Sequence, residues 1–116
     1  MVRNAPRALR KNLDELPFPA NDLIQHYTYP SEGIRKGEKV LNIIASRGCP
    51  FHCAYCNKAV YGSVYRQRNV GDVLDEIEFM FGRFGYDEVM FHDELFTANR
   101  RWIEEFLDEK NRRNLN

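Results

Sequence analysis

Short apolar runs alternate with longer amphipathic segments along this chain, and the alternation limits the folds open to it. The run at residues 40–45 is bounded by Lys39 before it and by Ser46-Arg-Gly48 after it, which favours a buried strand over a helix. Residues 89–91 predict a second short strand. Each run is followed by a segment with apolar residues at helical spacing. The order of strand, loop, helix, strand, loop, helix implies parallel strands joined by crossover helices.

The first helix is the most clearly marked element. Asn69 has the side chain to cap its amino end, and Gly85 stands where a left-handed terminator is expected. Apolar residues recur between them at three- and four-residue steps and predict one buried stripe: Val70, Val73, Leu74, Ile77, Met80, Phe81 and Phe84.

A second helix is predicted near the end of the sequence. We expect Thr97 to cap it, and we expect one face to carry Trp102, Ile103, Phe106 and Leu107. Residues 108–116 are polar and are expected to fray.

These elements predict an α/β fold with an incomplete sheet. Parallel sheets ordinarily have both faces covered, so two βα units alone should be poorly stable. We therefore interpret the chain as a fragment of a larger α/β barrel or sheet. Residues 1–39 are expected to form an interdomain linker or leader, and residues 40–116 the amino-terminal part of a truncated domain.

The expected leader is irregular and reads as a linker draped over a neighbouring domain. Pro17 and Pro19 flank Phe18, which favours an extended path. A short helical turn is predicted over residues 21–26. Residues 31–38 are polar, contain two glycines and predict a turn or a short hairpin.

All three cysteines lie in the loop that follows the first strand, as Cys49-Pro-Phe-His-Cys53-Ala-Tyr-Cys56. A disulfide scaffold spreads its cysteines along the chain, whereas this C-x3-C-x2-C spacing is typical of thiolates that converge on one inorganic centre. A cubane iron–sulfur cluster takes one thiolate per iron, so three thiolates would leave one iron open to a small molecule. Gly48 and Pro50 suit the reversal of direction that such a loop needs.

This motif, placed after a first strand and with Tyr55 just before the last cysteine, resembles the signature of the radical S-adenosylmethionine (radical SAM) superfamily. Residues 13–20, Ser46 to Cys56, Tyr65-Arg-Gln-Arg68 and residues 89–97 are similar to its cobalamin-associated branch, in which a cobalamin-binding domain precedes the radical SAM domain. The resemblance covers roughly residues 13–107, nearly the whole chain. It implies that the fold is the first two βα units of a partial TIM-type barrel.

The resemblance also implies cofactors and partners. Cys49, Cys53 and Cys56 would ligate a [4Fe–4S] cluster whose open iron binds SAM. In the full-length parent, reductive cleavage of SAM would release a 5′-deoxyadenosyl radical, in some members together with cobalamin-dependent methyl transfer. An electron donor of the flavodoxin or ferredoxin type and a substrate that the sequence does not identify would be the other partners. The fragment alone is expected to be inactive.

Four further residues receive roles from the same resemblance. Tyr55 would lie beside the SAM adenine. Glu94 and Asp93 occupy the place where many members use a Gly-Gly-Glu segment to reach the SAM amino group, and a carboxylate facing an ammonium is favourable. Arg68, with Arg66, would either contact the SAM carboxylate or anchor the loop.

A zinc site is the main alternative. His52 or His92 could complete a Cys3His tetrahedron, which would make the chain a zinc-stabilised, non-catalytic binding module, although no second ligand pair is visible in the sequence. His52 is otherwise expected to be structural. His92 is equally well interpreted as a core histidine bonded to a backbone carbonyl, and the acidic pair after it as a solvated turn.

Charge and hydropathy exclude other classes of partner. The 17 basic residues balance the 17 acidic ones, so no global field attracts nucleic acid or an anionic membrane. No apolar run is long enough to span a bilayer, and the amino-terminal residues lack the apolar stretch of a secretory signal. A cytoplasmic location is therefore expected, without membrane or nucleic-acid binding.

Overall fold

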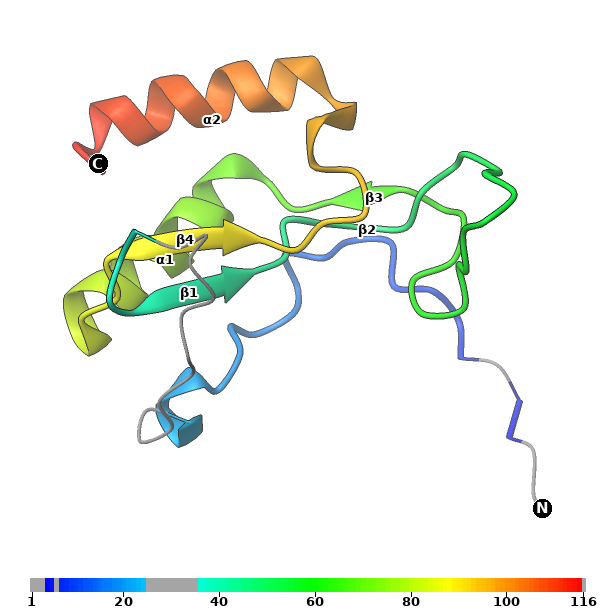
Figure 1. Ribbon diagram of the computed structural model, residues 1–116, viewed down its shortest axis with the longest axis horizontal. Coiled ribbons are helices and arrows are strands. Elements are labelled where there is room, and N and C mark those ends of the chain that lie inside the picture. Colours follow the sequence, from blue (N-terminus) through cyan, green and yellow to red (C-terminus); the bar gives the residue numbers. More distant parts are fainter. Residues whose placement is uncertain (1–3, 6, 25–35, 116) are drawn as a thin grey trace.

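The computed structural model describes residues 4–5, 7–24 and 36–115 and shows a small α/β fold (Figure 1). Strands β1 (Val40–Ile43) and β4 (Glu88–Phe91) pair in parallel, with Val40 opposite Glu88 and Ile43 opposite Phe91. Helix α1 (Val70–Phe84) connects them, and helix α2 (Arg100–Arg112) follows β4. The predicted order of elements and the parallel pairing are confirmed.

A second, smaller strand pair was not predicted. Strands β2 (Ser46–Arg47) and β3 (Arg66–Gln67) pair antiparallel and form the stem of the loop at residues 48–65. Two short 3-10 turns, η1 (Asn21–Ile24) and η2 (Phe96–Ala98), complete the described elements. Strands of two residues are too short to show a periodic pattern, so the sequence did not predict the stem.

Helix α1 follows the prediction closely. The Asn69 side chain accepts a hydrogen bond from the Asp72 amide at 2.8 Å, and Gly85 has a φ of 68° with its amide bonded to the Phe81 carbonyl. The predicted stripe is buried or packed against the core. Glu76 is buried as well, with only 1% of its surface exposed.

Helix α2 differs from the prediction at both ends. Its cap is Asn99, which accepts a hydrogen bond from the Trp102 amide, whereas Thr97 lies in η2. Leu107 is half exposed, so it does not share the buried face of Trp102 and Phe106. The helix also continues to Arg112, well into the segment that was expected to fray.

The core lies between the strand pair and the two helices. Leu41 and Ile43 of β1 pack against the apolar stripe of α1. Beside them, the rings of Phe91 and Phe96 stack with centroids 4.4 Å apart, and those of Trp102 and Phe106 stack at 5.2 Å. These rings join the loop after β4 to α2. Burial of large aromatic rings therefore positions the chain that leaves the second strand.

The leader packs on this same unit. Leu13 is 2% exposed, and the Asp14 carboxylate accepts a hydrogen bond from the Asn69 amide at 2.9 Å. The rings of Phe18 and Phe79 lie 6.4 Å apart. Of the predicted leader features, the helical turn is present as η1, although residues 25–26 lie outside the described residues. The same holds for residues 31–35 of the predicted hairpin.

A cluster of backbone hydrogen bonds joins the amino ends of β1 and β4. The amides of Lys36 and Gly37 donate to the Glu88 carboxylate, and the amides of Glu38 and Lys39 donate to that of Asp87. A Cβ on Gly37 would lie 2.5 Å from an Asp87 carboxylate oxygen, so this close approach requires glycine.

Candidate functional site at the cysteine loop

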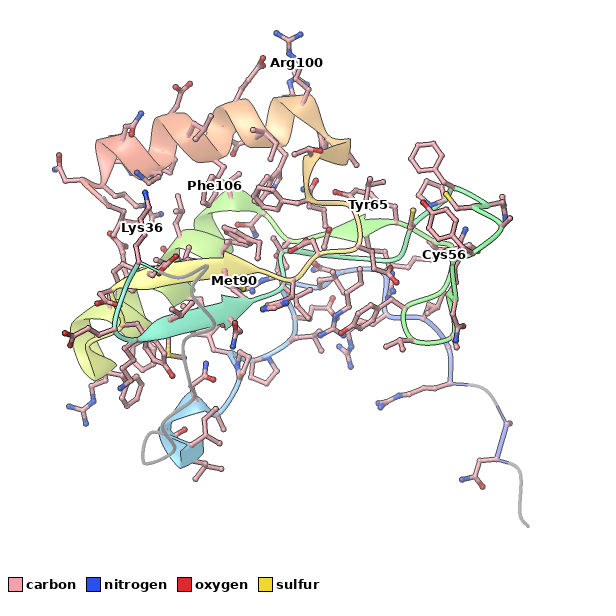
Figure 2. The ribbon with its side chains drawn as sticks, in the orientation of Figure 1. Lys36, Cys56, Tyr65, Met90, Arg100 and Phe106 are labelled. Atoms are coloured by element: carbon pink, nitrogen blue, oxygen red, sulfur yellow. The ribbon has the colours of Figure 1, made fainter. Side chains whose placement is uncertain are left out.

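The carboxyl ends of β1 and β4 point toward the cysteine loop (Figure 1). In open α/β sheets, ligands bind at this edge. The β2–β3 stem follows β1 almost directly, and the loop at residues 48–65 extends from it. In Figure 2, Cys56 lies out on the loop, while Tyr65 lies nearer the strand ends, where the loop returns to β3.

Backbone contacts close the loop at its base. The Cys49 amide donates to the Gly62 carbonyl at 3.3 Å, and the Gly62 amide donates to the Lys58 carbonyl at 3.0 Å. Gly48 has a φ of 82°, and a Cβ there would lie 2.3 Å from the Val64 carbonyl oxygen. A side chain at position 48 would therefore force the two arms of the loop apart.

Arg66 anchors the returning arm. Its guanidinium donates to the carbonyls of Arg10, Tyr61 and Val64, at 3.0, 3.2 and 3.3 Å. Of the two roles expected for Arg66, these contacts correspond to anchoring the loop. The Arg47 guanidinium lies over the Tyr61 ring, 5.6 Å from its centroid, and adds a second contact across the base.

All three cysteines are free thiols; Cys49 lies at the base of the loop, and Cys53 and Cys56 lie further out along it. Cys49 is partly buried, whereas Cys53 and Cys56 are exposed, and Tyr55 between them is 93% exposed. Across residues 4–5, 7–24 and 36–115, no three His, Cys, Asp or Glu side chains are gathered closely enough to hold a metal ion. The donor chemistry nevertheless fits an iron–sulfur cluster, because three free thiols share one loop whose base is fixed and whose tip is open to solvent.

Asp93 lies at the carboxyl end of β4 and contacts the segment between β1 and the stem. Its carboxylate accepts hydrogen bonds from the Ala45 amide at 3.1 Å and from the Ser46 hydroxyl at 2.5 Å. Burial raises the pKa of Tyr65 above its ordinary value, the neighbouring Ser46 opposes this rise, and the Asp93 charge adds to it. Glu94, by contrast, is exposed.

Arg68 lies within the fold. Its guanidinium pairs with Asp72 at 2.6 Å and with the buried Glu76 at 2.5 Å, and it lies over the Phe18 ring. Only 11% of the Arg68 side chain is exposed. These contacts join the residue after β3 to α1 and to the leader, and a SAM contact by Arg68 stays a prediction.

Sequence reasoning missed Glu76. Burial raises its pKa above the ordinary value, and the charge of Arg68 opposes that rise. A signal was present, because Asp72 and Glu76 lie four residues apart on one face of the predicted helix, and Arg68 precedes Asp72 by the same step.

The two histidines lie in different places. His52 is exposed on the cysteine loop. His92 follows β4, and its Nε2 forms a hydrogen bond of 2.8 Å with the Asn42 side-chain oxygen. Interpretation of His92 as a core histidine is therefore wrong: it is exposed, and its partner is a side-chain amide rather than a backbone carbonyl.

No helix in the described part of the chain is both long and apolar enough to cross a membrane. No family model and no solved structure matches the chain.

Three curated relatives match most of this chain. An uncharacterized methyltransferase of Pyrococcus horikoshii is 35% identical over 102 residues, which are 86% of this chain and 21% of the relative. The anaerobic magnesium-protoporphyrin IX monomethyl ester cyclase of Cereibacter sphaeroides is 34% identical over 85 residues, covering 73% of this chain and 13% of the relative. The cytidylyl-2-hydroxyethylphosphonate methyltransferase of Streptomyces wedmorensis is 33% identical over 94 residues, covering 73% and 17%.

The chain thus spans about a fifth or less of the length of these relatives. This chain belongs to the radical SAM superfamily and resembles its cobalamin-binding methyltransferases and cyclases.

Proposed function

We propose that this chain is the cluster-binding segment of a radical SAM enzyme, in which Cys49, Cys53 and Cys56 ligate a [4Fe–4S] cluster. The observation that carries the proposal is the presence of three free thiols on one solvent-open loop at the carboxyl ends of the parallel strands. The two βα units then correspond to the first part of a TIM-type barrel, and the leader to the linker before it. The bound cluster would supply the electron that cleaves SAM to methionine and a 5′-deoxyadenosyl radical.

The chain's own residues would bind and orient SAM. Tyr55, with 93% of its surface exposed, is available to lie against the adenine. The exposed Glu94 is available to accept hydrogen bonds from the methionine ammonium, and charge-assisted bonds of this kind are about twice as strong as neutral ones. Arg66 and Arg68 hold the stem and α1 in place beneath the loop, through the contacts described above.

For the whole protein we propose cobalamin-dependent methyl transfer, with SAM and an electron donor of the flavodoxin or ferredoxin type as partners. Two of the three relatives are named methyltransferases, which supports methyl transfer over the cyclisation named in the third. The segment described here carries cluster and SAM residues. We therefore expect it to bind cofactors without turning over a substrate.

Anaerobic reconstitution with iron and sulfide tests the cluster. We expect about four irons and four sulfides per chain, a broad visible absorption band and bleaching by dithionite. Each of Cys49→Ala, Cys53→Ala and Cys56→Ala should lower the iron content sharply, because each removes one thiolate. Val60→Ala, on the same loop and 78% exposed, is the matched control and should retain full iron content.

The opposite result identifies the alternative. A colourless chain that holds one tight zinc, and loses it in His52→Ala, would support the Cys3His module. Full metal content in Cys53→Ala would contradict a single site built from the three cysteines.

A further inference from the structure

The side chain of Asp93 joins the base of the cysteine loop to the end of the second strand. The stem pairs Ser46 with Gln67 and Arg47 with Arg66, so both arms of the loop start from this short ladder. Asp93 comes from the other βα unit, directly after β4 and His92. It is therefore placed to transmit the position of β4 to the loop.

The contacts of Asp93 occupy both of its carboxylate oxygens. One oxygen accepts the Ala45 amide and the other accepts the Ser46 hydroxyl. Ala45 is 0% exposed and Ser46 is 2% exposed, so water cannot readily replace the carboxylate. Loss of these bonds would leave two buried donors without a partner, which is costly in a folded protein.

The returning arm of the stem is held through its pairing with the departing arm. Ser46 pairs with Gln67, and the Arg68 amide donates to the Ala45 carbonyl at 2.8 Å. The Asp93 carboxylate thus contacts the departing arm directly and acts on the returning arm through this pairing. Glu94 is the next residue in the chain, and it is exposed.

We propose that Asp93 is a positioning residue that holds the stem of the cysteine loop, which leaves the SAM-directed carboxylate of the proposed function to Glu94. This inference rests on the proposed function, because it assigns different tasks to two adjacent acids of that site. The two differ in their surroundings: both oxygens of Asp93 accept hydrogen bonds inside the fold, whereas Glu94 is exposed. Asp93 therefore acts on the metal through the loop and makes no contact with SAM.

Cobalt(II) titration of the anaerobic chain tests the first half, because thiolate-to-cobalt charge-transfer bands report binding by the cysteines. We expect Asp93→Ala and Ser46→Ala to weaken cobalt binding by about 10- to 100-fold, as outer-shell substitutions at metal sites do. Asp93→Asn keeps an acceptor for the Ala45 amide and should recover part of the affinity. Asp108→Asn, an exposed acid on α2, is the control and should bind cobalt like the parent chain.

SAM binding to the reconstituted chain tests the second half. Glu94→Gln should weaken SAM binding and leave cobalt affinity unchanged. Asp93→Asn should lower cobalt affinity and leave SAM binding unchanged. If Asp93→Asn or Asp93→Ala binds cobalt normally and loses SAM, Asp93 is a direct ligand and the proposal is overturned. Circular dichroism of each variant separates loss of loop position from loss of the fold, and Ser46→Ala decides the matter where Asp93→Ala does not fold.

Cobalt binding and cluster assembly distinguish a failure of the positioning role from a failure of the proposed function. If cobalt binding requires all three cysteines and Asp93 but no iron–sulfur cluster can be built, the positioning role stands and the proposed function fails. If a cluster forms, and the Asp93 and Ser46 variants bind cobalt with the affinity of the parent chain, the proposed function stands and the positioning role fails.

Discussion

The helix-covered side of the sheet and the cysteine loop use their polar residues in opposite ways. Beneath α1, Arg68 and Glu76 are almost fully enclosed and form an ion pair inside the fold. On the loop, residues 50–57 are all exposed, and their polar and thiol groups face solvent. The enclosed side uses its charges to hold the scaffold together, whereas the loop is fixed at its base and presents its polar and thiol groups outward.

The largest effect should come from breaking the enclosed ion pair. Arg68→Leu leaves the Glu76 carboxylate, 1% exposed, without its partner, and should lower the free energy of unfolding by about 3–5 kcal/mol. Urea unfolding followed by circular dichroism measures the loss. The double variant Arg68→Leu with Glu76→Leu removes both charges and should recover most of the stability. A double variant as unstable as the single one would show that the pair is not the cause.

Truncation of an apolar side chain should have the next largest effect, and it should differ between the two regions. Leu74 lies on α1 and is 0% exposed, so Leu74→Ala should lower the free energy of unfolding by about 2–5 kcal/mol, because the cavity left behind cannot collapse fully. Val60→Ala on the loop, where the side chain is 78% exposed, should change stability by less than about 0.5 kcal/mol. Equal losses at the two positions in a urea titration would contradict the comparison.

Two glycines on the loop offer a finer test of where it is fixed. Gly48 and Gly62 both have positive φ, at 82° and 74°, so alanine carries a conformational cost of about 1–2 kcal/mol at each. Only at Gly48 would the new Cβ also meet a backbone oxygen, that of Val64. Gly48→Ala should therefore weaken cobalt binding by the thiols more than Gly62→Ala does. The reverse order would place the rigid point of the loop elsewhere.

The cap of α1 should give a smaller effect. Asn69→Ala removes the acceptor for the Asp72 amide and should cost about 1 kcal/mol of unfolding free energy. Asn69→Ser retains a capping oxygen and should restore most of it. Because the cap belongs to the scaffold, cobalt affinity of the folded protein should be the same in both variants.

Acid dependence should give the smallest and most graded effect. Hydrogen bonds from Arg112, and then from Arg113, lower the pKa of Glu109 from 4.5 to about 2. A carboxyl group with a lowered pKa stabilises the fold at pH values above its ordinary pKa of 4.5. That contribution is lost as the pH falls from 4.5 toward about 2. Urea midpoints measured across this range should fall less steeply in Glu109→Gln than in the parent chain. An identical slope would show that this surface network does not contribute.

The buried acid should behave oppositely. Since burial raises the pKa of Glu76, its contribution to stability decreases as the pH rises above the ordinary value of 4.5. Enclosed and exposed carboxylates can thus be distinguished by the sign of their pH dependence.

How far the sequence predicted this molecule depended on the range of the interaction. Asn69, Gly85 and the stripe between them act within one helix, so local pattern was sufficient. Thr97 and Asn99 are both capping residues, and the choice between them depended on η2, which the aromatic contacts of Phe96 hold in place. Local pattern could not supply that.

The cysteine thiols of the site could be predicted from the sequence, whereas the contacts that hold their loop could not. The cysteine spacing is local, and the three thiols lie on one loop as expected. The ligand role of these cysteines remains a prediction, as do the SAM contacts of Tyr55 and Glu94. Contacts such as Asp93 with Ser46 join residues 47 positions apart, and they exist only because two strands are aligned in one particular way.

That alignment is set far from the loop. A parallel pair has no hairpin turn to fix its register, and here the carboxylates of Asp87 and Glu88 bind four successive amides at the amino ends of the strands. A strand advances by about 3.3 Å per residue, so a slip by one position would carry Asp93 out of reach of Ser46. The amino-end carboxylates therefore fix the register of the two strands. From the opposite edge of the sheet, they determine whether the groups at the carboxyl edge come into contact.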